Sequence, residues 1–324
     1  MREMTYSQAL REALAEEMAR DPNIILLGED IGVYGGVFKV TEGLLAKFGP
    51  DRVREPPISE AAFVGPSVGL AMTGKRPVTE LMFMDFVWVA SDQIINQAAK
   101  MRYMTGGRVK MPLVIRAQQG GGRGNGAQHS QSLEAVFAHT PGLQVVLPST
   151  PADAKGLLKT ALRQDNPVIF IEHKLLYSTK GPVPEEEYTI PFGTAEVRAE
   201  GTDVTLVSYS RTLLHSLEAA EEARREGISV EVIDLRTIVP LDIDAVIRSV
   251  KKTGRLIVAH EAHRSAGFGA EIASLVQEQA FDYLDAPIVR VGAAHVPIPA
   301  SKPLEDVVLP GKQQILEAIR SIVA

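Results

Sequence analysis

The sequence of 324 residues contains no cysteine, which excludes disulfide bridges, thiolate metal sites and cysteine nucleophiles. It has no apolar run that approaches the roughly 18 residues of a membrane span, and its first residues, MREMTYSQALREALAEEM, carry acids that a signal peptide lacks. The net charge is −6 and the basic residues are scattered, which argues against a surface for nucleic acid or an anionic membrane. We therefore expect a cytoplasmic protein that acts on a small molecule.

Several common catalytic signatures are also missing. Neither GxGxxG nor GxxxxGK[ST] occurs, so a dinucleotide or nucleoside triphosphate site is not supported, and no GxSxG marks a serine hydrolase. His260 and His263 bracket Glu261 in the stretch AHEAH, but no third ligand is evident nearby. Zinc is therefore not favoured.

Short apolar runs of strand length alternate with helix-length segments, as in NIILLG, PVTELMF, MPLVIRA and PVIFIE. This alternation is typical of crossover units around a parallel sheet that is covered on both faces, so it predicts an α/β fold. The alternation stops after Lys174, in a stretch with three prolines, and resumes after Gly201. Because the chain exceeds the usual size of one domain, we predict a first domain at 1–180, a linker at 181–200 and a second α/β domain at 201–324.

Glu60 lies at the start of a predicted helix, in PPISEAAFVG, and the following residues 61–74 carry no charge. One interpretation is that Ser59 caps the helix and Glu60 occupies the first turn, where the helix dipole favours a carboxylate. The other is that apolar surroundings raise the affinity of Glu60 for a proton, which suits a partner for a ring nitrogen or a general acid or base. The spacing alone favours the first interpretation.

A glycine-rich stretch, QQGGGRGNGAQHSQS at 118–132, follows the predicted strand MPLVIRA and ends near His129. Glycines allow backbone to approach a ligand closely, and loops that follow strands are where α/β sheets bind ligands. A mobile connecting loop with a solvated histidine explains the same residues equally well.

Aromatic side chains gather at a predicted strand-to-helix junction. Met82, Phe83, Phe86 and Trp88 occur within MFMDFVW, and most clusters of this kind belong to a hydrophobic core. An apolar wall for a flat ring is the less common alternative.

Several longer stretches of the sequence, taken together, resemble a known protein family more closely than any single motif does. The chain contains, in order, GEDIG at 28–32, GGVFKVTEGL at 35–44, PISEAAFVG at 57–65, QIINQAAKMRYMTGG at 93–107, AQHSQS at 127–132 and VEVIDLRTIVPLD at 230–242. Together they resemble the beta subunit of the thiamine diphosphate-dependent decarboxylating component of 2-oxo acid dehydrogenase complexes. The resemblance implies a pyrimidine-binding domain followed by a transketolase C-terminal-like domain.

The resemblance also implies roles for individual residues. In similar proteins the glutamate of the ISE motif, here Glu60, hydrogen-bonds a ring nitrogen of the cofactor's aminopyrimidine and so promotes formation of the nucleophilic thiazolium carbon. The histidine of AQHSQ, here His129, binds intermediates and assists reductive acylation of the lipoyl group. Glu29 matches an acidic residue between paired cofactors. The positions that line the pyrimidine pocket correspond to Ile58, Met82 and Phe86.

The resemblance also implies bound metal ions and partner chains. Similar proteins hold the diphosphate and its magnesium through a GDG motif, which this chain lacks, on a separate alpha subunit. The resemblance therefore implies an obligate heterotetramer of two alpha and two beta chains that works with a lipoyl acyltransferase core. A potassium ion bound mostly by backbone carbonyls would map to Leu113, Ala161, Leu162, Gln164 and Asn166.

The substrate remains open between pyruvate and acetoin. The stretches EHKLLYS and GAAHVPIP, the latter with His295 where pyruvate-specific relatives often have aspartate, look more like beta subunits of acetoin dehydrogenases. Met82 and Phe86 disfavour a branched-chain oxo acid. A non-catalytic scaffold subunit is the alternative from another class, and Glu60 together with His129 argues against it, since a scaffold needs neither.

Overall fold

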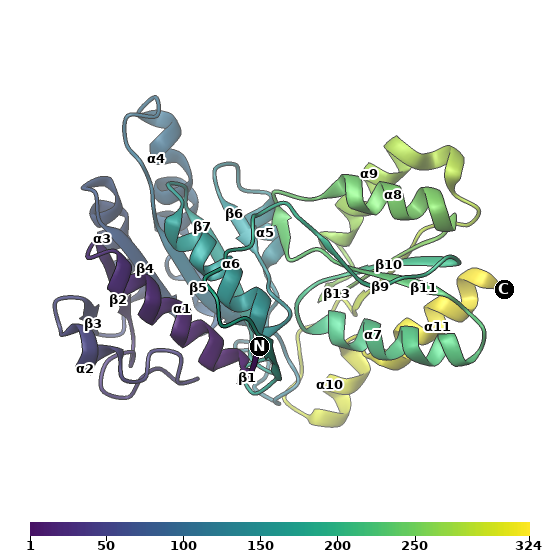
Figure 1. Cartoon of the computed structure of the whole chain (residues 1–324), viewed down its shortest axis with the longest axis horizontal. Coiled ribbons are helices and arrows are strands. Elements are labelled where there is room, and N and C mark those ends of the chain that lie inside the picture. Colours follow the sequence, from purple (N-terminus) through teal and green to yellow (C-terminus); the bar gives the residue numbers. More distant parts are fainter. The chain divides into compact units, whose positions relative to one another are not determined.

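The computed structural model describes residues 1–324, which divide into two compact units. The first unit comprises Met1–Gln119 and Val136–Phe192, and the second comprises Gly120–Ala135 and Gly193–Ala324. The first unit is purple to teal in Figure 1, and most of the second is green to yellow. The glycine-rich stretch therefore belongs to the second unit, although its flanking strands belong to the first.

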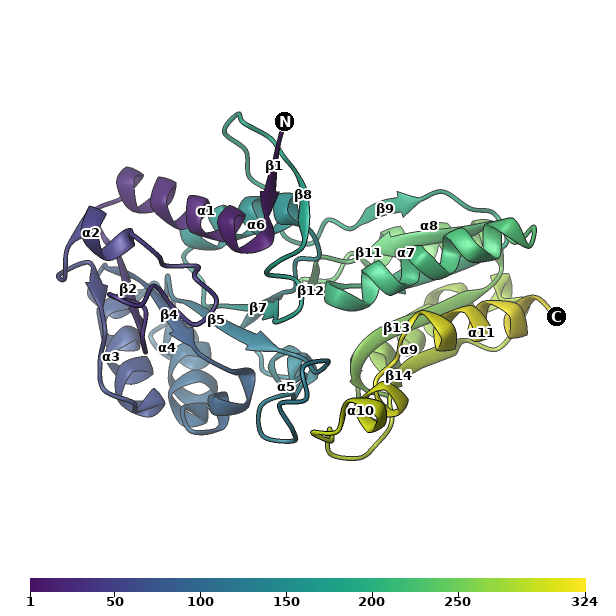
Figure 2. The same ribbon diagram turned by 90° about the horizontal axis from the view of Figure 1, so that it is seen from below.

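The first unit is built on a parallel sheet in which its strands follow the order β6-β7-β5-β4-β2-β3. Helices α1 and α6 cover one face of this sheet, and α3 and α4 cover the other (Figure 2). The strands are β2 (Ile24–Gly28), β3 (Val53–Arg54), β4 (Arg76–Leu81), β5 (Val114–Gln119), β6 (Gln144–Val146) and β7 (Val168–His173). The helices are α1 (Tyr6–Arg20), α2 (Leu44–Phe48), α3 (Glu60–Met72), α4 (Ala99–Met104) and α6 (Pro151–Arg163).

The sequence specifies these elements locally. Strands β5 and β7 are buried at every position, as expected for a parallel sheet with both faces covered. Helix α1 begins with a capping box between Thr5 and Gln8, and α6 begins with Thr150 as cap and Pro151 in its first turn. A short antiparallel pair, β1 (Arg2–Thr5) with β8 (Lys180–Val183), lies in the same unit. The chain between β4 and α4 forms a 3₁₀ helix at Met84–Trp88 and a π-helical turn at Gln93–Ala98.

The second unit has a sheet of strand order β14-β13-β10-β11-β9, in which only β9 is antiparallel to its neighbour. Helices α7 and α11 lie on one face, and α8 and α9 lie on the other (Figure 1). Its strands are β9 (Glu196–Ala199), β10 (Val204–Ser208), β11 (Val230–Asp234), β13 (Leu256–His263) and β14 (Val289–Ala293), and a further short strand, β12 (Thr237–Val239), is not part of this sheet. The helices are α7 (Ser210–Arg225), α8 (Ile243–Thr253), α9 (Gly269–Ala280), α10 (Lys302–Val308) and α11 (Lys312–Val323). Helix α5 (Glu134–Ala138) begins in the second unit and ends in the first.

The core of the second unit is apolar and continuous. Leu206 and Val232 from the sheet pack with Leu213 of α7 and with Leu316 and Ile319 of α11, all of them fully buried. Burial of this kind is worth about 1.5–3 kcal/mol for each large side chain. The α/β class predicted from the alternating pattern is confirmed for both units. No helix in either unit has the length and apolar character that crossing a membrane would require.

Candidate active site

Glu60 is the first residue of α3 and is only 7% exposed. The expectation that Ser59 caps this helix is wrong, because its side chain makes no cap hydrogen bond and its backbone lies at φ −173° and ψ 86°. These angles differ from the extended conformation in which a serine side chain reaches the first turn. The backbone N–H of Ser59 instead donates to the carboxylate of Glu29.

Glu29 and Glu60 form a buried pair of carboxyl groups. Glu29 follows β2 directly, is 9% exposed, and its Oε1 atom is buried without a hydrogen-bond partner. Burial raises the pKa of the Glu29 carboxyl, and the negative charges of Glu60 and Asp30 raise it further, while the N–H of Ser59 acts in the opposite direction. The surroundings of Glu29 therefore favour a ligand that donates hydrogen bonds.

The aromatic side chains after β4 pack edge to face. The ring of Phe83 lies 5.8 Å from Phe86 and 6.4 Å from Phe38, at interplanar angles of 86° and 78°. Phe86 and Met82 are half-buried, whereas Trp88 is 47% exposed, so the cluster is not simply core as its sequence suggests. Ile58, two residues before Glu60, is 83% exposed.

A buried ionic network lies at the C-terminal ends of three adjacent strands and was not anticipated from the sequence. Arg116 of β5 donates to both oxygens of Glu172 of β7 at 2.6 and 2.8 Å, and to Glu80 of β4 at 2.5 Å. The hydroxyl of Tyr177 donates to Glu172 at 2.5 Å. Burial raises the pKa of the Glu172 carboxyl, which Arg116 only partly offsets. The signal in the sequence was a charged residue inside each of three apolar strands.

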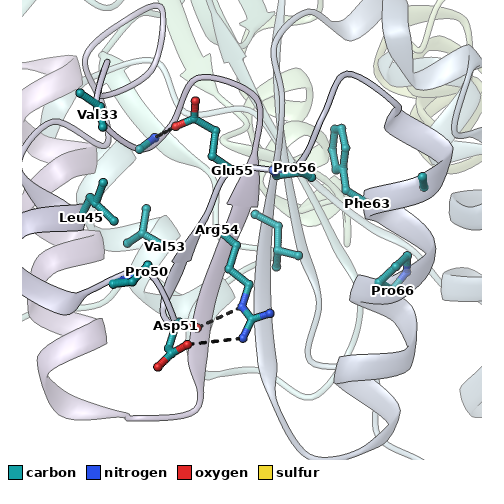
Figure 3. A pocket seen from close by; sticks show the side chains of 13 residues that line it. Val33, Leu45, Pro50, Asp51, Val53, Arg54, Glu55, Pro56, Phe63 and Pro66 are labelled. Carbon is teal, nitrogen blue, oxygen red and sulfur yellow. Dashed lines mark hydrogen bonds and ion pairs between the residues drawn. The ribbon is translucent and has the colours of Figure 1, made fainter.

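Each unit has a cavity that bears on the search for the active site. The first unit has a cavity of about 710 Å³ between β3 and α3, where Glu55 accepts a hydrogen bond from the backbone of Gly32 at 2.8 Å and Phe63 and Pro66 line the helix side (Figure 3). None of the residues predicted for the active site lines it. The second unit has a cavity of about 360 Å³ lined by Ala127, Gln131, His263, His295, Val296, Pro297 and Ile298.

His129 lies in the second unit, on the loop that contributes Ala127 and Gln131 to the smaller cavity. It is half-buried, and its backbone N–H donates to the carbonyl of Gly126 at 3.3 Å. His263 faces the same cavity, and its Nδ1 lies 2.7 Å from the carbonyl oxygen of Ala294. A carbonyl only accepts, so Nδ1 of His263 carries a proton.

The sequence relationships match this architecture. Residues 2–180 match the transketolase pyrimidine-binding domain and residues 193–315 the transketolase C-terminal domain. The chain is 49% identical to the acetoin:2,6-dichlorophenolindophenol oxidoreductase subunit beta of Cupriavidus necator, over 98% of this chain and 97% of that protein. It is 46% identical to the pyruvate dehydrogenase E1 component subunit beta of Bacillus subtilis over 99% of both chains, and 47% identical to that of Rickettsia felis over 99% and 98%. This chain belongs to that family of dehydrogenase beta subunits.

A solved structure agrees with the fold of these beta subunits. The chain superposes on a protein described as a split gene transketolase, inactive beta4 tetramer, with a TM-score of 0.82, 24% identity and coverage of 99% and 98%. At that identity the likeness shows the fold alone. The resemblance inferred from the motifs is confirmed, as are the transketolase-like fold and the assignment to the first component of a 2-oxo acid or acetoin dehydrogenase.

The first unit of this beta subunit fits the aminopyrimidine part of thiamine diphosphate. An aminopyrimidine offers N–H donors at its edge, and the unpartnered Oε1 of Glu29 beside the buried carboxyl of Glu60 supplies acceptors. It also has a flat apolar face, which suits the side chains of Met82 and Phe86. No group of three or more histidine, aspartate or glutamate side chains in residues 1–324 has an arrangement that could hold a metal ion.

The five residues predicted for potassium lie around the end of α6 and the starts of β5 and β7. Several of their groups already accept hydrogen bonds. The carbonyl of Leu113 accepts from Val168 at 2.9 Å, that of Ala161 accepts from Gln164 at 3.3 Å, and that of Gln164 accepts from Arg76 at 3.3 Å. Asn166 accepts from the guanidinium of Arg102, while Leu162 is a buried core residue of α6. A potassium ion at this position stays a prediction.

Proposed function

We propose that this chain provides the pyrimidine-side half of a thiamine diphosphate site in the oxidative decarboxylation of pyruvate, with transfer of the acetyl group to a lipoyl group of an acyltransferase. The proposal rests above all on the buried Glu29 and Glu60 pair at the start of α3. Family membership supports the reaction class, since the relatives named above are pyruvate and acetoin dehydrogenase subunits.

When bound, thiamine diphosphate supplies a nucleophilic carbon and an electron sink for loss of carbon dioxide. Glu60 would form a hydrogen bond with a pyrimidine ring nitrogen of this group, and the uncharged helix that follows Glu60 would keep water away from that hydrogen bond. Glu29 would accept a hydrogen bond from the bound group on its buried Oε1, which has no partner in the chain. Ile58, Met82 and Phe86 contact the ring.

His129 serves the acyl-transfer step. Imidazole changes charge near neutral pH, so His129 can carry a proton to or from the lipoyl sulfur. An alpha subunit with a GDG motif holds the diphosphate and magnesium, and two alpha and two beta chains assemble so that each site lies between an alpha and a beta chain. Potassium bound by backbone carbonyls of the first unit would support the assembly.

Cleavage of acetoin is the second candidate reaction. The observation that favours it is His295, which lines the smaller cavity of the second unit where pyruvate-specific relatives often carry aspartate. An imidazole in place of a carboxylate changes both the charge and the donors that a substrate meets.

The test is to assemble the chain with an alpha subunit that contains GDG and to follow reduction of a dye with either pyruvate or acetoin. Glu60→Gln should lower the turnover by about 10²- to 10⁴-fold, as expected for loss of a group that handles a proton. Glu185→Gln is the control, because the Glu185 side chain is 64% exposed. Unchanged activity and cofactor affinity in the Glu60 variant would refute the role and favour a scaffold.

A further inference from the structure

The glycine-rich loop that leads to His129 is held by two carboxylates of the second unit. Glu305 of α10 accepts the backbone N–H of Gly122 on Oε1 at 2.7 Å and that of Gly124 on Oε2 at 3.1 Å. Glu261 of β13 accepts the N–H of Gly121 at 2.7 Å. Hydrogen bonds to an ionised acceptor are roughly twice as strong as neutral ones, so these three contacts fix the loop backbone.

The contacts explain why this stretch is rich in glycine. A Cβ atom on Gly121 would lie 2.6 Å from a methyl group of Leu309 and 3.1 Å from Oε1 of Glu305. A Cβ atom on Gly124 would lie 2.9 Å from the carbonyl oxygen of Ala300, and this glycine has φ +67°. The loop therefore approaches α10 as closely as it does only because side chains are absent.

Glu305 is itself firmly placed. Its side chain is fully buried, its N–H donates to Ser301 at 2.8 Å, and its carbonyl accepts from Leu309 at 2.9 Å. The carbonyl of Val308, on the same helix, accepts from Ala294 just after β14 at 3.1 Å. These backbone hydrogen bonds join the helix that carries Glu305 to the residue that follows β14.

The other end of the loop is attached to the same unit. Glu134 is fully buried and accepts a hydrogen bond from the hydroxyl of Tyr209 at 3.0 Å, and Tyr209 is the residue before α7. Between the two attachments lie residues 125–133, with His129 at their centre. A segment fastened at both ends restricts where its central side chain can go.

We propose that Glu305 is a positioning residue that holds the glycine loop so that His129 meets the acyl acceptor. The proposal rests on the proposed function of His129 in acyl transfer. Glu305 acts on His129 through α10 and the loop, without touching the substrate itself.

Asp306 provides a matched control, since it is the next residue on α10 but is exposed and pairs with Lys302. Glu305→Ala, Glu305→Gln and Asp306→Asn should each be made in the full chain and assembled with the alpha subunit. Two activities are then compared, dye reduction after decarboxylation and acyl transfer to a lipoylated acceptor. Because positioning acts on one step, we expect Glu305→Ala to slow acyl transfer by at least about tenfold and dye reduction by less than about threefold.

A second readout does not depend on activity. Trypsin cleaves after Arg123, an exposed residue whose following N–H is bound by Glu305. Loss of that bond should speed cleavage at Arg123 by about tenfold or more, since local opening governs proteolysis. Cleavage after the exposed Arg108 of the first unit should not change and serves as an internal control.

These variants distinguish failure of the positioning role of Glu305 from failure of the proposed function of His129. Glu305→Gln keeps the shape of the side chain and one accepting oxygen, so it should retain more acyl transfer than the alanine variant. If His129→Ala impairs acyl transfer but neither Glu305 variant does, the positioning role is overturned and the proposed function stands. If His129→Ala leaves acyl transfer intact, the proposed function of His129 itself fails. Equal loss of both activities in assembled Glu305→Gln would also overturn the proposal, because it would show general damage.

Discussion

Replacing Arg116 with methionine should destabilise the first unit strongly. The guanidinium is 1% exposed and makes three hydrogen bonds, two to Glu172 and one to Glu80. Methionine fills much of the same space but leaves two buried carboxyl groups with no cation between them. Removal of one partner from a buried ion pair costs about 3–5 kcal/mol, which corresponds to a fall in melting temperature of about 6–20 °C for a unit of this size.

The loss should also depend on pH. Burial already raises the pKa of Glu172, and removal of Arg116 takes away the main influence that lowers it. A carboxyl whose pKa in the folded state exceeds the unfolded value of about 4.3 destabilises the fold as the pH rises above that value. The destabilisation should therefore be smaller at pH 5 than at pH 8.

Urea unfolding followed by the fluorescence of Trp88 measures this effect, because Trp88 is the only tryptophan and lies in the first unit. Arg108→Met, at an exposed position, is the control and should stay within about 0.5 kcal/mol of the parent chain. Adding Glu80→Gln and Glu172→Gln to the Arg116 variant should restore part of the stability, since no buried charge then remains unpaired. Two results would refute the reasoning. One is a free energy of unfolding for Arg116→Met equal to that of the parent chain, and the other is a triple variant that is less stable than Arg116→Met alone.

Three further predictions concern stability. Burial lowers the pKa of His260 to about 4, below the unfolded value of about 6.5, so the free energy of unfolding should fall as the pH drops from 6.5 toward 4. The variant His260→Gln should lose this pH dependence in urea titrations followed by circular dichroism. Gly142→Ala should lower the free energy of unfolding by at least about 2 kcal/mol in the same assay, because φ is +103° and a Cβ atom would overlap the carbonyl of Ala99; an unchanged midpoint would contradict the structure. Hydrogen bonds from Lys159 and Arg163 lower the pKa of the mostly exposed Glu187 to about 2, so a small stabilisation present above pH 4.5 should disappear toward pH 2, and Glu187→Gln should show no such acid loss.

The sequence predicts the sheets well because apolar periodicity and burial are local properties. Strands β5 and β7 read as continuous apolar runs, and each is buried at every position. Glu60 was placed correctly at the start of a helix, since an uncharged run of helical length follows it. Ser59 was misjudged because capping depends on backbone angles that the residue type alone does not determine.

Contacts between residues that are far apart in the sequence were not predicted, because no local pattern encodes them. Glu305 binds Gly122 across 183 positions, and no periodic pattern links an acid on a late helix to a glycine after an early strand. The same holds for Arg116 and Glu80, which meet only because β4 and β5 pair in register. Charged residues within apolar strands were the available signal, since such residues are rarely buried unless paired.

Buried carboxylates on neighbouring strands of the first unit differ in the charged groups that surround them. Glu80 and Glu172 both pair with Arg116, so a buried cation offsets part of their negative charge within the sheet. Glu29, at the end of β2, has the carboxylates of Glu60 and Asp30 as its charged neighbours and keeps one buried oxygen without a partner. Glu29 therefore lacks the cation that the neighbouring acids have, and its buried oxygen retains a local free-energy penalty. A bound group that donates hydrogen bonds to Glu29 would remove that penalty. This difference between the acids of neighbouring strands supports the proposal that the cofactor binds at the start of α3.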